Sequence, residues 1–250
     1  MKFKITNLKF NNVSNLLLTN EKVLNYFKFK AIVKNKLKQS KVNLYLNTKL
    51  KKNQIKNYDK IIICTYSSNN DILNNFLKYK NLKKNRYELV EKIIVKLPNK
   101  YKKKSYVIID GKFVCLDPYL GTDYHLLSDV KNSKIEVIKK NKPIFKSFKK
   151  KYLNDKIHKN LKISNFKKFI KHSSNYLPFI KKAKYIGSMF IVRALKLNVE
   201  RTDERTGEIQ QIDQKFISVF SGKWNTCVYV ANKLDVLLSK SVPSKLISQK

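Results

Sequence analysis

Two apolar runs flank an Asp-Gly pair in the segment SYVIIDGKFVCLD, residues 105–117. Asp110-Gly111 can supply the positive φ angles that a type I′ turn needs, so the pattern predicts a β-hairpin over 105–117. Apolar residues occupy consecutive positions along both runs, which is typical of strands that are covered on both faces. We therefore expect this hairpin to lie in the core.

A second pair of strands is predicted near the end of the chain. The segments FIVRALKLNVERT (190–202) and EIQQIDQKFISVF (208–220) are joined at DERTG, where Gly207 is the turn glycine. They predict a hairpin over 190–220. The stretch that follows, SGKWNTCVYVANKLDVLLSK, predicts a loop that leads into a helix or into a strand and a helix, with Trp224 as a core anchor.

Helical spacing of apolar residues predicts three further helices. One begins at about Asn20, with Thr19 or Asn20 as its cap, and another occupies part of 67–85, with caps among 68–70. The third is predicted in the second half of the chain from four apolar residues at helical spacing, which are Ile163, Phe166, Phe169 and Ile170.

Strand patterns complete the predicted elements. Apolar and polar residues alternate at 41–50, which favours a half-buried strand, and the run IIIC at 61–64 predicts a short buried one. The segment 87–97 fits either a helix or a strand. Together the patterns predict an α/β chain of the α+β type, in which helices pack a small mixed or antiparallel sheet that has hairpins at 105–117 and 190–220 and lysine-rich extensions.

Charge limits what such a fold can be used for. The chain has 250 residues, of which 55 are basic and 17 acidic, for a formal net charge of +38. Screening by physiological salt acts over about 8 Å, so the lysines of a compact chain this size repel one another and attract polyanions. Drift in an AT-rich gene explains why only four basic residues are arginine, but it does not explain the shortage of acids.

The positive charge is concentrated in two blocks. Residues 1–100 hold 23 basic and 5 acidic residues, and residues 131–185 hold 18 and 2, whereas residues 101–130 hold four of each. Residues 186–250 are nearly balanced, with 10 and 6. Uniform drift would not produce this distribution, so we expect the basic surface to be used. The blocks also suggest three regions, 1–130, 131–185 and 186–250, with a single domain as the alternative.

Lysine clusters beside aromatic residues predict contacts with nucleic acid. Lysine side chains bind phosphate backbones without reading bases, and aromatic rings can stack on unpaired bases. Rings that merely pack in the core are the alternative for each aromatic residue. The predicted RNA-binding residues are Lys51, Lys52, Lys83, Lys84, Arg86, Lys102, Lys103, Lys104, Lys149, Lys150, Lys151, Lys167, Lys168, Lys181 and Lys182.

The segment NVERTDERTGEIQQIDQKF (198–216) differs from the rest of the chain, because it holds five acids and two of the four arginines. Acids there would repel phosphate, so the predicted hairpin should face water or a neighbouring protein. Planar, forked guanidinium groups suit protein interfaces. The predicted interface residues are Arg201, Glu204, Arg205 and Glu208, and an ordinary solvated hairpin is the alternative.

Known catalytic and metal-binding patterns are missing from the sequence. The histidines share no metal-ligand spacing, and Asp117, Asp123 and Asp129 are too far apart for a calcium loop. Cys64 and the other two cysteines lie in apolar runs without a CxxC pair, which predicts buried, reduced thiols. The five glycines form no phosphate-binding loop. We expect no enzyme, cofactor, metal or small-molecule substrate.

Membrane and export signals are also missing. The best apolar stretch, YIGSMFIVRALKLNV, is short and carries two basic residues, so we expect no integral membrane span. The first residues have neither the apolar core of a signal peptide nor the Arg- and Ser-rich character of an organelle transit peptide. This predicts a soluble protein that is either cytosolic or made in the compartment where it works.

The chain resembles ribosomal proteins encoded by strongly AT-rich organelle genomes, mitochondrial ones in particular. The resemblance is one of type and is carried by the Lys-, Asn-, Ile-, Phe- and Tyr-rich composition, the excess of Lys over Arg, and basic blocks such as KSFKKKYL and NFKKFIKH. It implies a structural role in the mitochondrial matrix, with lysines on rRNA phosphates, the 190–220 hairpin against another ribosomal protein, and synthesis inside the organelle. The alternatives are a non-ribosomal nucleic-acid-binding protein or enzyme, and a peripheral basic subunit of an organellar membrane complex.

Overall fold

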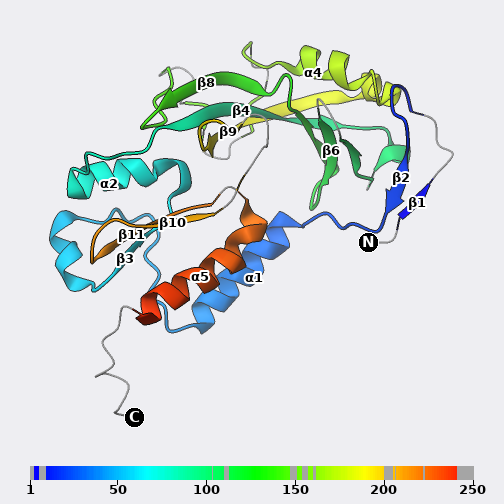
Figure 1. Ribbon diagram of the computed structural model, residues 1–250. Helices are drawn as coiled ribbons and strands as arrows, with labels where there is room; N and C mark the ends of the chain where they lie inside the picture. Colours follow the sequence, from blue (N-terminus) through cyan, green and yellow to red (C-terminus); the bar gives the residue numbers. More distant parts are fainter. Residues whose placement is uncertain are drawn as a thin grey trace. The chain divides into compact units, whose positions relative to one another are not determined.

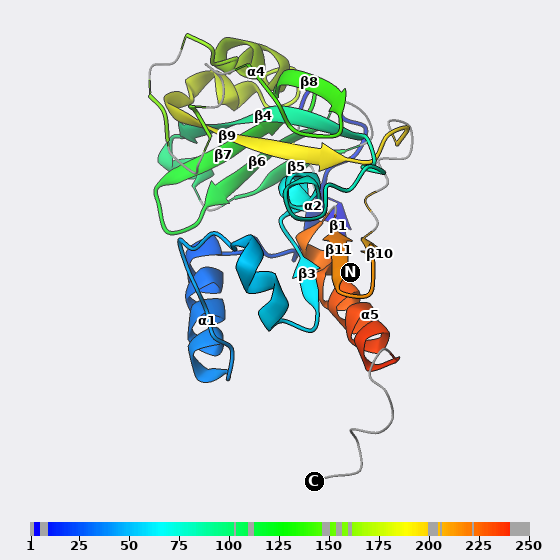
Figure 2. The same ribbon diagram turned by 90° about the vertical axis from the view of Figure 1, so that its left-hand side faces the viewer.

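The computed structural model describes residues 3–5, 10–102, 104–109, 113–146, 151–153, 157–159, 162–199, 205, 207–221 and 223–240. The fold is of the α+β class with antiparallel sheets and several helices, as the sequence predicts (Figures 1 and 2). Contacts divide the chain into two units. The first unit contains 1–46, 89–136 and 145–191, and the second contains 47–88, 137–144 and 192–250. The three contiguous regions suggested by charge stay a prediction.

The main sheet has six strands in the order β5-β6-β7-β4-β8, and β9 also pairs with β4. Neighbours β5–β6, β6–β7 and β7–β4 are antiparallel. Segment 87–97 therefore belongs to a strand. The strands are β4 (Asn85–Lys96), β5 (Tyr106–Ile108), β6 (Val114–Tyr119), β7 (Tyr124–Asp129), β8 (Lys134–Lys140) and β9 (Lys184–Leu195).

In the first unit, helix α4 (Phe166–Ser173) and the 3-10 helix η4 (Pro178–Lys182) pack against the sheet (Figures 1 and 2). Phe169 of α4 is fully buried in a cluster that also contains Ile93 and Leu127 of the strands. The helix predicted from apolar spacing near 166 is thus confirmed. Its amphipathic spacing turns one face to the sheet and leaves lysines on the other.

The hairpin predicted at 105–117 is confirmed by the register of β5 and β6, in which Ile108 pairs with Val114. The predicted turn residues Asp110 and Gly111 lie outside the described residues. Our expectation that both faces are covered was wrong. Val107 is 55% exposed, and burial alternates along β6, because the core cluster covers one face only.

The second unit contains a three-stranded sheet with α2 (Asn69–Leu77) and α5 (Cys227–Lys240) on its two faces (Figure 1). The strands β10 (Glu208–Gln211) and β11 (Phe216–Phe220) are antiparallel, and β11 is parallel to β3 (Ile61–Ile63). Phe216 packs with residues of α2, whereas its neighbour Ile217 packs with residues of α5. The consecutive apolar residues of β11 are therefore buried on both faces.

The remaining elements are peripheral or short. They are β1 (Phe3–Ile5), β2 (Leu17–Thr19), α1 (Tyr26–Gln39), and the 3-10 helices η1 (Lys52–Asn57), η2 (Tyr66–Ser68), η3 (Asn99–Tyr101) and η5 (Trp224–Thr226). Helix α1 begins later than predicted, because the cap is Asn25, whose side chain accepts a hydrogen bond from the Lys28 backbone N–H.

Two predicted strand arrangements were wrong. Region 190–220 does contain a hairpin, but it is formed by β10 and β11, and β9 pairs with β4 instead. Position 207 needs a glycine because the backbone there lies close to α5, and a Cβ would be only 2.4 Å from the Val230 side chain. The strand predicted at 41–50 does not form, and its alternating residues Val42, Leu44 and Leu46 are exposed.

The cysteines differ from the buried thiols that were predicted. Cys64 and Cys227 are exposed, and Cys115 is half-buried. All three are free thiols. Burial, and then a hydrogen bond to Asp117, raise the pKa of Cys115 to about 12. The Cys115 thiol is therefore protonated and unreactive near neutral pH.

Among the described residues, no helix has both the length and the apolar character needed to cross a membrane.

Candidate functional site

The predicted RNA-binding residues fall in both units of the protein. Most are exposed, and Arg86 and Lys102 are half-buried. Lys103, Lys149 and Lys150 lie outside the described residues. Those of the first unit are Lys102, Lys104, Lys151, Lys167, Lys168, Lys181 and Lys182, and those of the second unit are Lys51, Lys52, Lys83, Lys84 and Arg86.

Helix α4 and η4 bring lysines together around an open hollow of about 440 Å³ in the first unit. We call this the lysine hollow. Lys167 and Lys171 are one helical turn apart, and Lys181 comes from η4. No acidic residue lines the hollow within the described part of the chain. Its other lining residues are Phe166, Ile170, Ser174, Asn175 and Ala183.

Lys171 was not among the predicted RNA-binding residues, because those were chosen from lysine clusters and Lys171 has no lysine beside it in the sequence. A spacing of four from Lys167 within a predicted helix was the signal that could have found it. Two other predicted lysines lie elsewhere in the first unit. Lys102 forms an ion pair with Asp123 at 3.3 Å, and Lys151 lies over the ring of Tyr152 at 5.2 Å from its centre.

Two buried acids of the first unit have partners inside the fold. Glu91 is fully buried, and its carboxylate accepts hydrogen bonds from the Ser164 hydroxyl at 2.6 Å and from the Asn165 backbone N–H at 2.9 Å, at the start of α4. Asp129 is 1% exposed and lies 2.9 Å from Nδ1 of His172. These negative charges satisfy interior donors and are absent from the surface.

In the second unit, the buried acid Glu88 lies between two of the four arginines. Its Oε1 is 2.8 Å from Nη2 of Arg86, and its Oε2 accepts hydrogen bonds from Nε (2.8 Å) and Nη2 of Arg193. Glu88 is fully buried, while the side chains of Arg86 and Arg193 are 15% and 24% exposed. Arg86, predicted to bind RNA, is therefore engaged within the fold.

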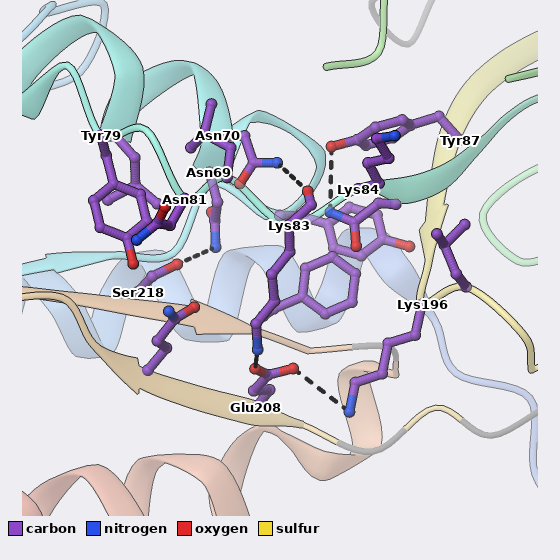
Figure 3. A pocket seen from close by; sticks show the side chains of 17 residues that line it. Asn69, Asn70, Tyr79, Asn81, Lys83, Lys84, Tyr87, Lys196, Glu208 and Ser218 are labelled. Carbon is purple, nitrogen blue, oxygen red and sulfur yellow. Dashed lines mark hydrogen bonds and ion pairs between the residues drawn. The ribbon is translucent and has the colours of Figure 1, made fainter. Parts of the chain in front are cut away.

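A larger pocket of about 510 Å³ lies wholly in the second unit, and Figure 3 shows its lining. We call it the asparagine pocket. Amide, aromatic and lysine side chains dominate its walls. The lining residues are Tyr66, Asn69, Asn70, Leu73, Tyr79, Asn81, Leu82, Lys83, Lys84, Asn85, Tyr87, Lys196, Leu197, Glu208, Gln210, Ser218 and Phe220.

Two asparagines at the start of α2 connect parts of the pocket wall by hydrogen bonds. Asn69 is 5% exposed, and its amide donates to the Ser218 hydroxyl at 3.1 Å and to the Val219 carbonyl at 2.8 Å. Asn70 is 8% exposed, and its amide donates to the carbonyls of Lys83 at 2.9 Å and Asn141 at 2.6 Å. From the sequence, both residues were predicted only as helix caps.

One carboxylate and three lysines set the charge of the asparagine pocket. Oε1 of Glu208 binds Lys83, and Oε2 lies 3.6 Å from Nζ of Lys196 (Figure 3). The hydrogen bond from Lys83 lowers the pKa of Glu208, against the effect of burial. With Lys84 also lining the pocket, its net charge is positive.

Of the four predicted interface residues, the structure describes two. Glu208 binds Lys83 within the second unit, and Arg205 is half-buried. Arg201 and Glu204 lie outside the described residues. The role of this segment as a protein interface stays a prediction.

Aromatic rings supply flat apolar surface to the same pocket. The rings of Tyr66 and Phe220 are stacked, with centres 5.7 Å apart and planes 24° from parallel. The Tyr66 hydroxyl donates to the Ala194 carbonyl at 2.9 Å and accepts from its N–H at 3.0 Å, so this ring is fixed in place. Tyr87 is 1% exposed and forms part of the wall.

Within the described residues, no group of three or more His, Cys, Asp or Glu side chains is placed to hold a metal ion. No protein-family model matches the chain, and no curated protein matches it.

Proposed function

We propose that the protein is a structural constituent of a ribonucleoprotein particle, specifically a mitochondrial ribosome, and that it binds the rRNA phosphate backbone through exposed lysines. The observation that carries this proposal is the lysine hollow, in which three cationic side chains surround an open surface without an acidic neighbour among the described residues. Such a surface attracts phosphate oxygens and has no carboxylate to compete with them.

The placement of the acids supports the proposal. Three of the few carboxylates, those of Glu88, Glu91 and Asp129, are buried with interior partners, so their charges do not neutralise the surface lysines. The exterior is therefore more positive than a uniform distribution of 55 basic and 17 acidic residues would give. A surface of this kind binds polyanions by releasing their counterions, largely without regard to base sequence.

The structural role is tested first on the native protein. We expect it to sediment with a ribosomal subunit and to be released when the RNA is digested by nuclease. Sedimentation with membranes after a salt wash would support the alternative of a basic membrane-complex subunit and contradict the proposal. A free, nuclease-insensitive protein would contradict it as well.

The lysine hollow is tested on the purified full chain. Changing its three lysines to glutamine should make the log–log slope of RNA affinity against salt shallower by about 2 to 3, since each phosphate contact contributes about 0.7–0.9. The matched control removes the same charge from helix α1, through Lys34→Gln, Lys36→Gln and Lys38→Gln. The proposal predicts a smaller change for this control, and equal changes would contradict a specific role for the hollow.

A further inference from the structure

We infer that the asparagine pocket binds a single ribonucleotide with an unpaired base. This inference rests on the proposed function in that an unpaired residue of RNA is one source of the ligand. A free ribonucleotide is the other source, and the two share the same chemistry.

The size and construction of the pocket suit a small ligand. Its volume of about 510 Å³ lies within the roughly 300–1,000 Å³ that is typical of sites for small molecules. Asn69 and Asn70 are more than nine-tenths buried, and the amide group of each donates two hydrogen bonds, to backbone carbonyls and to Ser218. The walls are therefore held in place before a ligand arrives, which reduces the entropy lost on binding.

The charge of the pocket favours an anion. Lys83, Lys84 and Lys196 face one carboxylate, that of Glu208, which leaves an excess of two positive charges. Glu208 binds Lys83 and Lys196 and holds their ammonium groups near the pocket (Figure 3). Lys84 lines the pocket without an ion pair to a described acid, so its ammonium group is available to a phosphate.

The remaining lining groups favour a flat ring with polar edges. Tyr66 and Phe220 offer a stacked aromatic pair, and stacking on such rings does not depend on which base is present. Gln210 lines the pocket from β10, and its side chain makes no hydrogen bond to a described residue. A free carboxamide can donate to and accept from the edge of a base. Phosphate, aromatic ring and polar base edge are combined in a nucleotide.

Strand β10 offers a matched pair of variants. Gln210 lines the pocket, whereas Gln211 is exposed and points to the other face of the strand. We expect Gln210→Ala to weaken binding of the four ribonucleoside 5′-monophosphates, measured by calorimetry on the full chain, by about three- to ten-fold. Gln211→Ala should change the affinity by less than about two-fold, because a solvated side chain contributes little.

A second variant separates the phosphate from the base. Lys84→Gln should weaken binding of the monophosphates by about three- to ten-fold and leave binding of the unphosphorylated nucleosides unchanged. Gln210→Ala should weaken both. Ribose 5-phosphate and inorganic phosphate should bind more weakly than the nucleotides. Equal binding of ribose 5-phosphate, or a Gln210→Ala protein that behaves like the Gln211→Ala protein, would overturn the inference.

The source of the nucleotide is distinguished with a five-nucleotide single-stranded RNA and a base-paired RNA duplex. If the ligand is a residue of RNA, Gln210→Ala weakens binding of the single strand but not of the duplex, and the single strand binds more tightly than any mononucleotide. If the ligand is a free nucleotide, the mononucleotide binds at least as tightly as the single-stranded RNA. If Gln210→Ala changes the affinity for neither the mononucleotides nor the single-stranded RNA, but RNA binding stays steeply salt-dependent, the pocket assignment fails and the proposed function stands. When no RNA binds, the proposed function fails.

Discussion

Replacing the buried Glu88 with glutamine tests whether two of the rare arginines are retained for the fold. The substitution keeps the size of the side chain and one acceptor oxygen but removes the charge that Arg86 and Arg193 share. Both arginine side chains are largely buried, with 15% and 24% of their surface exposed, so water can replace the lost carboxylate only in part.

The expected loss follows from these contacts. Removing one partner of a buried ion pair costs about 3–5 kcal/mol, and the partial exposure of the arginines together with the remaining acceptor reduces this to about 2–4 kcal/mol. In a chain of this length, that loss corresponds to a fall in Tm of about 5–15 °C. Urea unfolding and thermal melting of the full chain, followed by circular dichroism in about 0.3 M salt, would measure it.

Asp235→Asn is the matched control, because it makes the same change in net charge at an exposed position of α5 in the same unit. We expect a change of less than about 0.5 kcal/mol from it. Arg193→Lys is a useful companion, since it keeps the charge and loses the forked contact with Glu88. If Glu88→Gln is no more destabilising than Asp235→Asn, the arginine pair does not support the fold as argued.

Two further predictions concern ionisable groups of the first and second units. Burial lowers the pKa of His125 below its ordinary value, and nearby backbone groups oppose this only in part, so the unfolded chain takes up a proton first as the pH falls below about 6.5. His125→Phe should therefore flatten the loss of stability between about pH 6.5 and 5, measured by urea unfolding. A pH profile of stability that is unchanged by the substitution would refute this. Iodoacetamide at pH 8 should modify Cys227 rapidly and Cys115 hardly at all, as measured by peptide mass spectrometry. The reason is that Cys227 is exposed, whereas burial raises the pKa of Cys115 to about 12. Fast modification of Cys115 in the folded protein would contradict its half-buried position in β6.

Local patterns predicted those elements whose burial is decided by near neighbours. The helix at 166–173 and the hairpin of β5 and β6 follow from apolar spacing, and both form. The alternation at 41–50 also fits a strand, yet none of the described strands pairs with it, and its apolar side chains are exposed. An alternating pattern becomes a strand only when another strand satisfies its backbone groups.

Local sequence patterns could not predict which distant strands pair with each other. β3 pairs with β11 across about 150 residues, and β9 pairs with β4 rather than with its neighbour in sequence. The asparagine pocket depends on the same distant contacts, because Asn69 and Ser218 meet only when α2 lies on the β3–β11 sheet. One local signal was available for the contact between Arg86 and Glu88, since a spacing of two places both residues on the same face of β4.

The salt dependence of RNA binding by the purified full chain tests the central claim most directly. If about eight lysines contact phosphate, the affinity for RNA should fall with salt at a log–log slope of about −6 to −7. The binding should be of similar strength for RNAs of unrelated sequence, since phosphate contacts carry no base preference. A slope near zero, or no RNA binding at low salt, would contradict the account.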